Sequence, residues 1–221
     1  MWLALFTTFV SAIAGAILGR TPGRVNYDIV GVFVFAFFLG VGGGLTRDLL
    51  LGNLPPLALR TPWYIVTVAA AVLLVLTVGR WISRNSWGFV FLDALSLGLY
   101  AVIAAQMALD FGLPAIGAIL VGFLAAISGG VIVSILRGET PEILQPSTPY
   151  ALLAVIGVTV FVLTVPYLGG LAAILCLVIV VVLRFVTLNW NISTKSVRPI
   201  SAAGTKPKQT RRKGGRPVRK P

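Results

Sequence analysis

The residues with the most obvious chemical potential form a glycine-rich motif inside an apolar segment. Gly42, Gly43 and Gly44 precede two adjacent charges, Arg47 and Asp48. Consecutive glycines tolerate non-helical dihedrals and relax a helix. Backbone carbonyls that are freed in this way can coordinate a partly dehydrated cation. The motif therefore predicts a broken helix beside an ion pathway, and the alternative is close helix packing through small residues.

The two charges of this motif are expected to have partners elsewhere in the fold. Ionisable side chains at membrane depth cost several kcal/mol, so they face the protein interior or water. Adjacent residues on a helix do not face each other. Arg47 and Asp48 are therefore predicted to reach other helices rather than to neutralise each other, although a structural ion pair at the membrane edge is an alternative.

A second copy of the motif follows 86 residues later. It contains Ser128, Gly129 and Gly130, and it has Val133 and Ser134 where the first copy has its charges. The two serines are weak candidates for lining a pathway, because serine in a helix often bonds to its own backbone. The same offset relates six further pairs of identical residues: Gly31 and Gly117, Phe37 and Phe123, Leu50 and Leu136, Gly52 and Gly138, Pro55 and Pro141, and Tyr64 and Tyr150.

Composition indicates an all-α integral membrane protein. Of the 221 residues, 57% are hydrophobic and 11% are charged, with a mean hydropathy of +0.98. A soluble domain has about 25% charged residues, and about 20 apolar residues cross a bilayer. Seven spans are predicted, at about Trp2–Leu18, Ile29–Leu51, Trp63–Val78, Phe89–Ala108, Ala115–Leu136, Ala151–Val165 and Leu168–Leu188.

The same composition argues against an enzyme and against a bound cofactor or metal. The chain has no histidine and one cysteine, Cys176, which removes imidazole acid–base catalysis and the commonest metal ligand. Asp28, Asp93 and Asp110 lie near predicted span ends, where solvation or local capping is their expected role.

Charge distribution predicts the orientation of the chain. Cytoplasmic loops carry the excess of Lys and Arg, and an outside N-terminus with a cytoplasmic C-terminus leaves only Arg60 in the outer loops. Each repeat then contains three spans, so the second copy must be inverted relative to the first. Inverted repeats commonly surround a site near the bilayer midplane.

The expected organisation is a transmembrane domain over residues 1–192 and a disordered basic cytoplasmic tail over residues 193–221. Within the domain, the repeats cover about residues 1–84 and 85–166, and a seventh helix covers about residues 167–190. The tail contains ten Lys and Arg residues and no acid. Its composition cannot support a folded core and suits anionic lipid, whereas a specific nucleic-acid partner is not expected because the tail lacks aromatic residues.

At these motifs the chain resembles the bacterial branch of the trimeric intracellular cation channel (TRIC) family. The similarity rests on the element from Gly42 to Pro55, its degenerate second copy, and the segment from Asp93 to Ala101, and it extends over about residues 5–188. The resemblance implies seven transmembrane helices and a homotrimer with one pore in each subunit. It also implies conduction of monovalent cations, chiefly potassium, in the plasma membrane of a bacterium.

By resemblance, pore roles fall on the two glycine motifs and on the charge pair. The candidate pathway residues are Gly42, Gly43, Gly44, Arg47, Asp48, Ser128, Gly129, Gly130 and Ser134. The chain departs from the family pattern at Val133 and Ser134, where bacterial members usually repeat the Arg-Asp pair. The leading hypothesis is thus a potassium-type channel between glycine-broken second and fifth spans, and the alternative is a secondary transporter of a small solute such as an amino acid.

Overall fold

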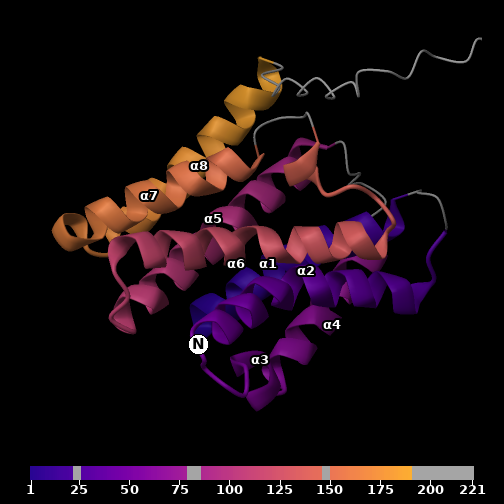
Figure 1. Ribbon diagram of the computed structural model, residues 1–221. Helices are drawn as coiled ribbons and strands as arrows, with labels where there is room; N and C mark the ends of the chain where they lie inside the picture. The colour runs from indigo at the N-terminus through magenta and orange to yellow at the C-terminus, as the bar shows by residue number, and fades with distance from the viewer. Residues whose placement is uncertain (22–25, 79–85, 146–149, 191–221) are drawn as a thin grey trace, which may run out of the picture.

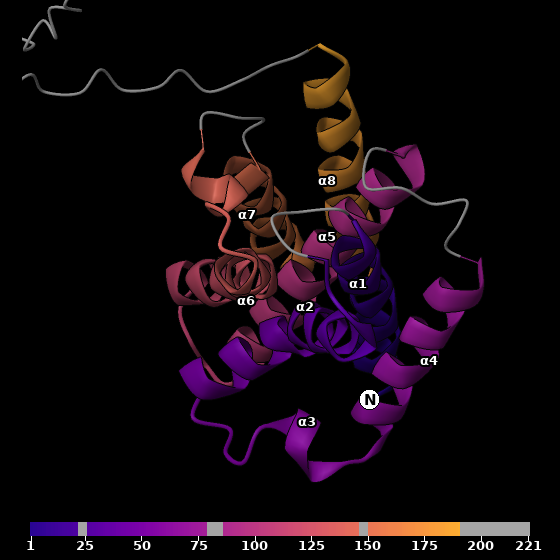
Figure 2. The ribbon, with the colours of Figure 1, turned by 90° about the vertical axis from the view of Figure 1, so that its right-hand side faces the viewer.

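The computed structural model describes residues 1–21, 26–78, 86–145 and 150–190, and all regular structure in these ranges is helical. Figure 1 shows the arrangement, and Figure 2 shows it turned by 90°. The elements are α1 (Trp2–Arg20), α2 (Ile29–Leu50), α3 (Leu57–Arg60), α4 (Trp63–Val78), α5 (Trp87–Asp110), α6 (Ala115–Leu136), the 3-10 turn η1 (Glu142–Leu144), α7 (Tyr150–Leu168) and α8 (Leu171–Asn189). The predicted tail at residues 193–221 lies outside the described residues.

Equivalent positions of the two sequence copies have the same local structure. α2 and α6 each contain 22 residues, and their bounds differ by the offset of the sequence repeat. Both helices end at a glycine with positive φ, 67° at Gly52 and 66° at Gly138. The next amide then bonds back into the helix, from Asn53 to the Asp48 carbonyl and from Glu139 to the Ser134 carbonyl. This is the hydrogen-bond pattern of a glycine-terminated helix.

The C-terminal ends of α2 and α6 lie at opposite ends of the molecule. Arg47, near the end of α2, lines a cavity with Ala4 at the start of α1. Arg137, which follows α6, donates a hydrogen bond to the carbonyl of Leu18 near the end of α1. The two ends are called the Arg47 end and the Arg137 end below. Since α2 contacts α6 directly, these equivalent helices cross in antiparallel directions.

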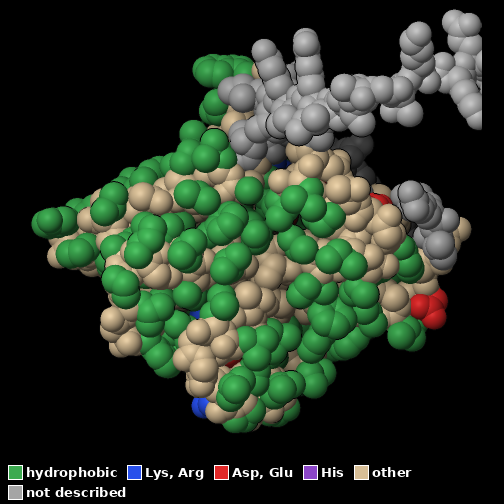
Figure 3. All heavy atoms as spheres, in the orientation of Figure 1, with side chains coloured by type: hydrophobic (Ala, Val, Ile, Leu, Met, Phe, Trp, Pro, Cys, Tyr) green, Lys and Arg blue, Asp and Glu red, His purple; other side chains and the backbone are tan. Residues whose placement is uncertain are grey.

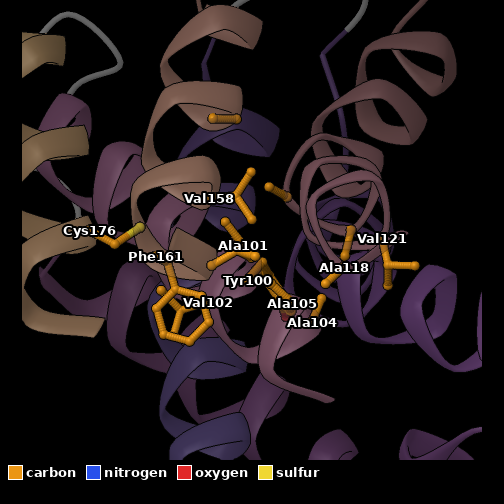
Figure 4. Packing of buried hydrophobic residues seen from close by; sticks show 14 of the residues in the cluster. Tyr100, Ala101, Val102, Ala104, Ala105, Ala118, Val121, Val158, Phe161 and Cys176 are labelled. Carbon is orange, nitrogen blue, oxygen red and sulfur yellow. The ribbon is translucent and has the colours of Figure 1, made fainter. Parts of the chain in front are cut away.

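Each half of the chain has its own hydrophobic core. One cluster joins α1, α2 and α4, and a larger one joins α5, α6, α7 and α8. Figure 4 shows part of the larger cluster, with Phe161 of α7 and Cys176 of α8 beside small residues of α5 such as Ala101. The small residues allow these helices to pack closely.

The surface is suited to a membrane. In the part of the chain that the structure describes, six helices are long and apolar enough to span a bilayer, and α4 is a shorter apolar helix of 16 residues. The third predicted span coincides with the described bounds of α4. On the face seen in Figure 3, hydrophobic side chains cover most of the surface and few charged atoms are visible. Exposed hydrophobic side chains of this kind are stable in contact with lipid, whereas their contact with water is unfavourable.

Candidate functional site

Arg47 and Asp48 pair with each other, so the prediction that they reach separate partners is wrong. The Nε and Nη2 atoms of Arg47 lie 2.9 Å and 2.7 Å from Oδ1 of Asp48. Both residues are buried, with 4% and 1% of their surface exposed. Adjacent residues on a helix point in different directions, but the arginine side chain is long enough to fold back beside the following residue.

The second carboxylate oxygen of Asp48 fixes the loop after α2. Its Oδ2 accepts a hydrogen bond of 2.7 Å from the backbone amide of Leu57, the first residue of α3. A buried carboxylate needs such partners for both oxygens. The pair therefore serves a structural purpose at the Arg47 end and also presents charge to the cavity described below.

The prediction of broken helices is also wrong. α2 continues without interruption through Gly42, Gly43 and Gly44, and α6 continues through Gly129 and Gly130. Continuous helices keep their carbonyls in intrahelical hydrogen bonds. The glycine carbonyls are therefore not freed to coordinate an ion in this conformation.

Three of these glycines instead allow close packing. A Cβ atom at Gly42 would lie 3.0 Å from Cα of Gly129, and one at Gly129 would lie 3.0 Å from the carbonyl oxygen of Leu39. A Cβ at Gly43 would lie 2.6 Å from Cδ1 of Tyr100. Side chains at these positions would separate α2 from α6 or displace the Tyr100 ring.

The last glycine of each motif has a different environment. No atom lies within 4 Å of a Cβ built at Gly44 or at Gly130, setting aside their own helix backbone and chain neighbours. Gly44 lines a small cavity at the Arg47 end. Gly130 lines two cavities on the way to the Arg137 end. Equivalent glycines thus face open space on opposite sides of the helix crossing.

Three cavities follow one another through the molecule. The Arg47 cavity, of about 10 Å³, contains Arg47, Asp48 and Gly44 in its lining. The central cavity, of about 20 Å³, contains Gly43, Gly129 and Gly130. The Arg137 cavity, of about 260 Å³, contains Gly130 again, with Ser134 and Arg137. A volume of about 10–15 Å³ holds one water molecule, so the first two cavities have room for about one water each.

Neighbouring cavities share lining residues, so they lie in series, and this series is called the route below. Tyr100 lines both the Arg47 cavity and the central cavity. Asp93, Gly130 and Tyr150 line both the central cavity and the Arg137 cavity. Beyond the Arg47 cavity, Arg47 also lines a wider and mainly apolar cavity of about 650 Å³, the lateral cavity, between α1, α5, α7 and α8.

Asp93 is a functional candidate that the sequence interpretation missed. Its predicted role was capping or solvation, but its Oδ2 lies 3.7 Å from Nη2 of Arg184 on α8. The same Arg184 atom lies 3.3 Å from Oε2 of Glu142, and the guanidinium lies 4.9 Å from the Tyr150 ring centroid. By contrast, Asp28 caps α2 as expected, by accepting a hydrogen bond from the Gly31 amide.

The predicted site residues divide into two groups. Seven of them line the route: Gly43, Gly44, Arg47, Asp48, Gly129, Gly130 and Ser134. Gly42 packs against Gly129 instead, and the Ser128 hydroxyl donates to the Ala125 carbonyl of its own helix at 3.1 Å. Among residues missed by sequence reasoning, Tyr100, Asp93 and Tyr150 each line two cavities. The signals for them were the segment from Asp93 to Ala101, which carried part of the family resemblance, and the pairing of Tyr150 with Tyr64 in the repeat.

Comparisons with known proteins agree with this description. The chain matches the family described as "Glycine transporter" over residues 1–80 and 90–166, and these two segments coincide with the two copies of the repeat. A UPF0126 membrane protein of Deinococcus radiodurans is 34% identical over 143 residues, which is 65% of each chain. The aligned region thus spans just under two thirds of that relative.

Solved structures with the same fold are cation channels. A structure described under "Structural basis for conductance through TRIC cation channels" is 29% identical, with a TM-score of 0.77 over 89% of this chain and 96% of that chain. The TRIC orthologue from Rhodobacter sphaeroides is 28% identical, also with a TM-score of 0.77, over 86% of this chain and 97% of that chain. The chain therefore belongs to the glycine transporter family, and its fold is that of the TRIC channels, as its resemblance at the glycine motif indicated.

Proposed function

We propose that this protein is a passive channel for monovalent cations in the plasma membrane of a bacterium. The observation that carries the proposal is the series of cavities from the Arg47 end to the Arg137 end, in a fold that solved cation channels share. The route runs between α2, α5 and α6, and carboxylates occur near both of its ends, at Asp48 and Asp93.

Water and side chains, rather than freed carbonyls, are the ligands available to an ion on this route. The helices are continuous at the glycines, so an ion would keep part of its hydration shell and meet the Asp93 carboxylate and the tyrosine hydroxyls. A divalent cation binds through six to eight oxygen ligands. The central cavity offers one carboxylate and a few hydroxyl groups, and this set suits potassium, which loses its water more easily than a divalent ion.

The proposed architecture is a pair of inverted three-helix repeats with α8 as an addition. Its support is the offset shared by α2 and α6, and the antiparallel crossing of these helices. The Arg137 end is proposed to face the cytoplasm, because Arg20, Arg137 and Arg184 lie toward this end and cytoplasmic surfaces are enriched in basic residues. A homotrimer with one route in each subunit follows the trimeric assembly named for the Rhodobacter sphaeroides relative.

Transport of a small amino acid is the second candidate, and the family description favours it. The Arg137 cavity, with about 260 Å³ and both arginines and carboxylates in its lining, offers both charges that a zwitterion needs. The central cavity of about 20 Å³ is too small for an amino acid in this conformation. Alternating access would have to open it in every transport cycle.

Planar-bilayer recording of the purified protein separates the two candidates. A channel gives unitary potassium currents that follow the electrochemical gradient and need no amino acid. A transporter gives no unitary current but takes labelled glycine into proteoliposomes with saturation. Absence of potassium current from protein that is trimeric in detergent would refute the channel proposal.

A further inference from the structure

We infer that Tyr100 is the gate of the cation route, a proposal that rests on the proposed channel function. Tyr100 lies on α5, outside both glycine motifs, and its side chain is buried with 7% of its surface exposed. It is the residue shared by the linings of the Arg47 cavity and the central cavity. An ion that moves from one cavity to the other must pass its ring.

The fit of the ring against α2 explains how Tyr100 closes the route. A Cβ at Gly43 would lie 2.6 Å from Cδ1 and 2.8 Å from Cγ of this ring. The same Cβ would lie 2.7 Å from the carbonyl oxygen of Ala125 on α6, so only a glycine leaves room here both for the ring and for the close approach of α6. Gly43 therefore acts as the seat of the gate, rather than as a helix break or as a coordinating carbonyl.

A hydrogen bond holds the ring on this seat. The Tyr100 hydroxyl donates to the carbonyl of Gly40, one helical turn before Gly43. The bond is buried and joins α5 to α2. If the ring rotates, the buried hydroxyl loses its hydrogen bond to Gly40. Water can replace this bond only when the neighbouring cavities are hydrated. Rotation of the ring is thus coupled to hydration of the two cavities.

Only one half of the chain supplies such a ring. The position equivalent to Tyr100 in the first half is Ala14 on α1, a fully buried small residue. Gly43 and its equivalent Gly129 face the equivalent backbone carbonyls of Ala125 and Leu39, but a ring lies against Gly43 and is not among the nearest neighbours of Gly129. The backbone of the route is therefore repeated in the two halves, but the gate comes from α5 alone.

Two substitutions of Tyr100 separate the ring from its hydroxyl. Tyr100→Phe keeps the ring and removes one buried hydrogen bond of the closed state, so the open-to-closed ratio should rise by roughly five-fold to ten-fold while unitary conductance stays the same. Tyr100→Ala removes the ring and should raise unitary conductance as well. Tyr167→Phe and Tyr167→Ala are matched controls, because Tyr167 of α7 is 86% exposed and lies outside the linings of the described cavities.

Cysteine accessibility tests the gate without any current. Cys176 is the single cysteine of the chain, so Cys176→Ala provides a thiol-free background for Gly44→Cys or Gly130→Cys. Silver ion, a monovalent cation that reacts with thiols, is added to one side of sealed proteoliposomes of known orientation. From the Arg47 side it should react with the thiol introduced at Gly44 but not with the one at Gly130, and adding Tyr100→Ala should make both thiols reactive.

The outcomes distinguish the gate from the channel. Currents from the unsubstituted protein that are unchanged by both Tyr100 substitutions would overturn the gate and leave the channel proposal intact. Loss of current with trimers preserved would also overturn it, since the ring would then be needed for conduction. Equal reaction of both thiols with silver while Tyr100 is present would overturn the gate even if Tyr100→Ala failed to fold.

Discussion

Gly44 and Gly130 occupy equivalent positions in the two halves and open into different cavities, one on each side of Tyr100. Neither would place a Cβ within 4 Å of an atom outside its local backbone. Their neighbours Gly43 and Gly129, one residue earlier, are in close contact with Tyr100 and with the Leu39 carbonyl. Each motif thus combines a glycine required for packing with a glycine that faces the route.

This difference predicts opposite effects of alanine at adjacent positions. Gly43→Ala and Gly129→Ala add a methyl group where there is no room, and such overpacking costs about 1–3 kcal/mol. Gly44→Ala and Gly130→Ala should be neutral or stabilising, because alanine favours a helix by about 1 kcal/mol over glycine. Thermal unfolding of the four variants in one detergent gives the comparison. Equal losses of stability at all four positions would contradict the assigned environments.

Removal of the Asp48 carboxylate should destabilise the Arg47 end strongly. Asp48→Ala leaves the buried Arg47 charge and the Leu57 amide without their partner, and breaking a buried ion pair costs about 3–5 kcal/mol. The double variant Arg47→Met with Asp48→Ala should recover part of this loss, because no unpaired charge remains. Thermal unfolding measures both variants.

Arg60→Ala is the control for this prediction, since Arg60 bonds the same loop from an exposed position. Its effect should be small, as exposed interactions contribute little. A double variant that is less stable than Asp48→Ala alone would show that Arg47 stabilises the fold independently of Asp48.

Neutralising Asp93 should reduce potassium conductance in a salt-dependent manner. The carboxylate lines two cavities of the route and pairs with Arg184, so Asp93→Asn makes this part of the route more positive. The reduction should be largest at low ionic strength, because the Debye length falls from about 30 Å at 0.01 M to about 3 Å at 1 M salt. Unitary conductance over a series of potassium chloride concentrations measures it.

Asp28→Asn is the matched control for Asp93→Asn. It removes the same charge from a residue outside the described cavities, and asparagine still caps α2. Conductance should therefore remain close to that of the unsubstituted protein. A similar reduction in both variants would assign the effect to overall charge rather than to the route.

Substitution of Arg137 should have the opposite sign. Arg137 lines the largest cavity on the route and pairs with Glu139 at 2.9 Å. Arg137→Gln removes a positive charge that repels cations, so potassium conductance should increase, again most clearly at low salt. The same recordings test this variant. Reduced conductance from trimers of normal stability would show that Arg137 acts through the position of α1 and not through its charge.

Much of the fold could be read from the sequence because it depends on local properties. Apolar length located the spans, and the third predicted span has the bounds of α4. The second and fifth predicted spans, Ile29–Leu51 and Ala115–Leu136, lie within one residue of the bounds of α2 and α6.

What those residues do was decided by the tertiary structure. A run of glycines is compatible with both a break and a close crossing, and only the approach of α6 to α2 makes the continuous helix favourable. The partner of Arg47 depends on how a flexible side chain is packed, and the positions of Tyr100 and Asp93 depend on where α5 meets α2 and α8. The sequence alone determined the repeat and the membrane-spanning helices, which follow from local composition. Tertiary packing determined the series of cavities and the place of Tyr100 between two of them, because these depend on contacts between residues far apart in the chain.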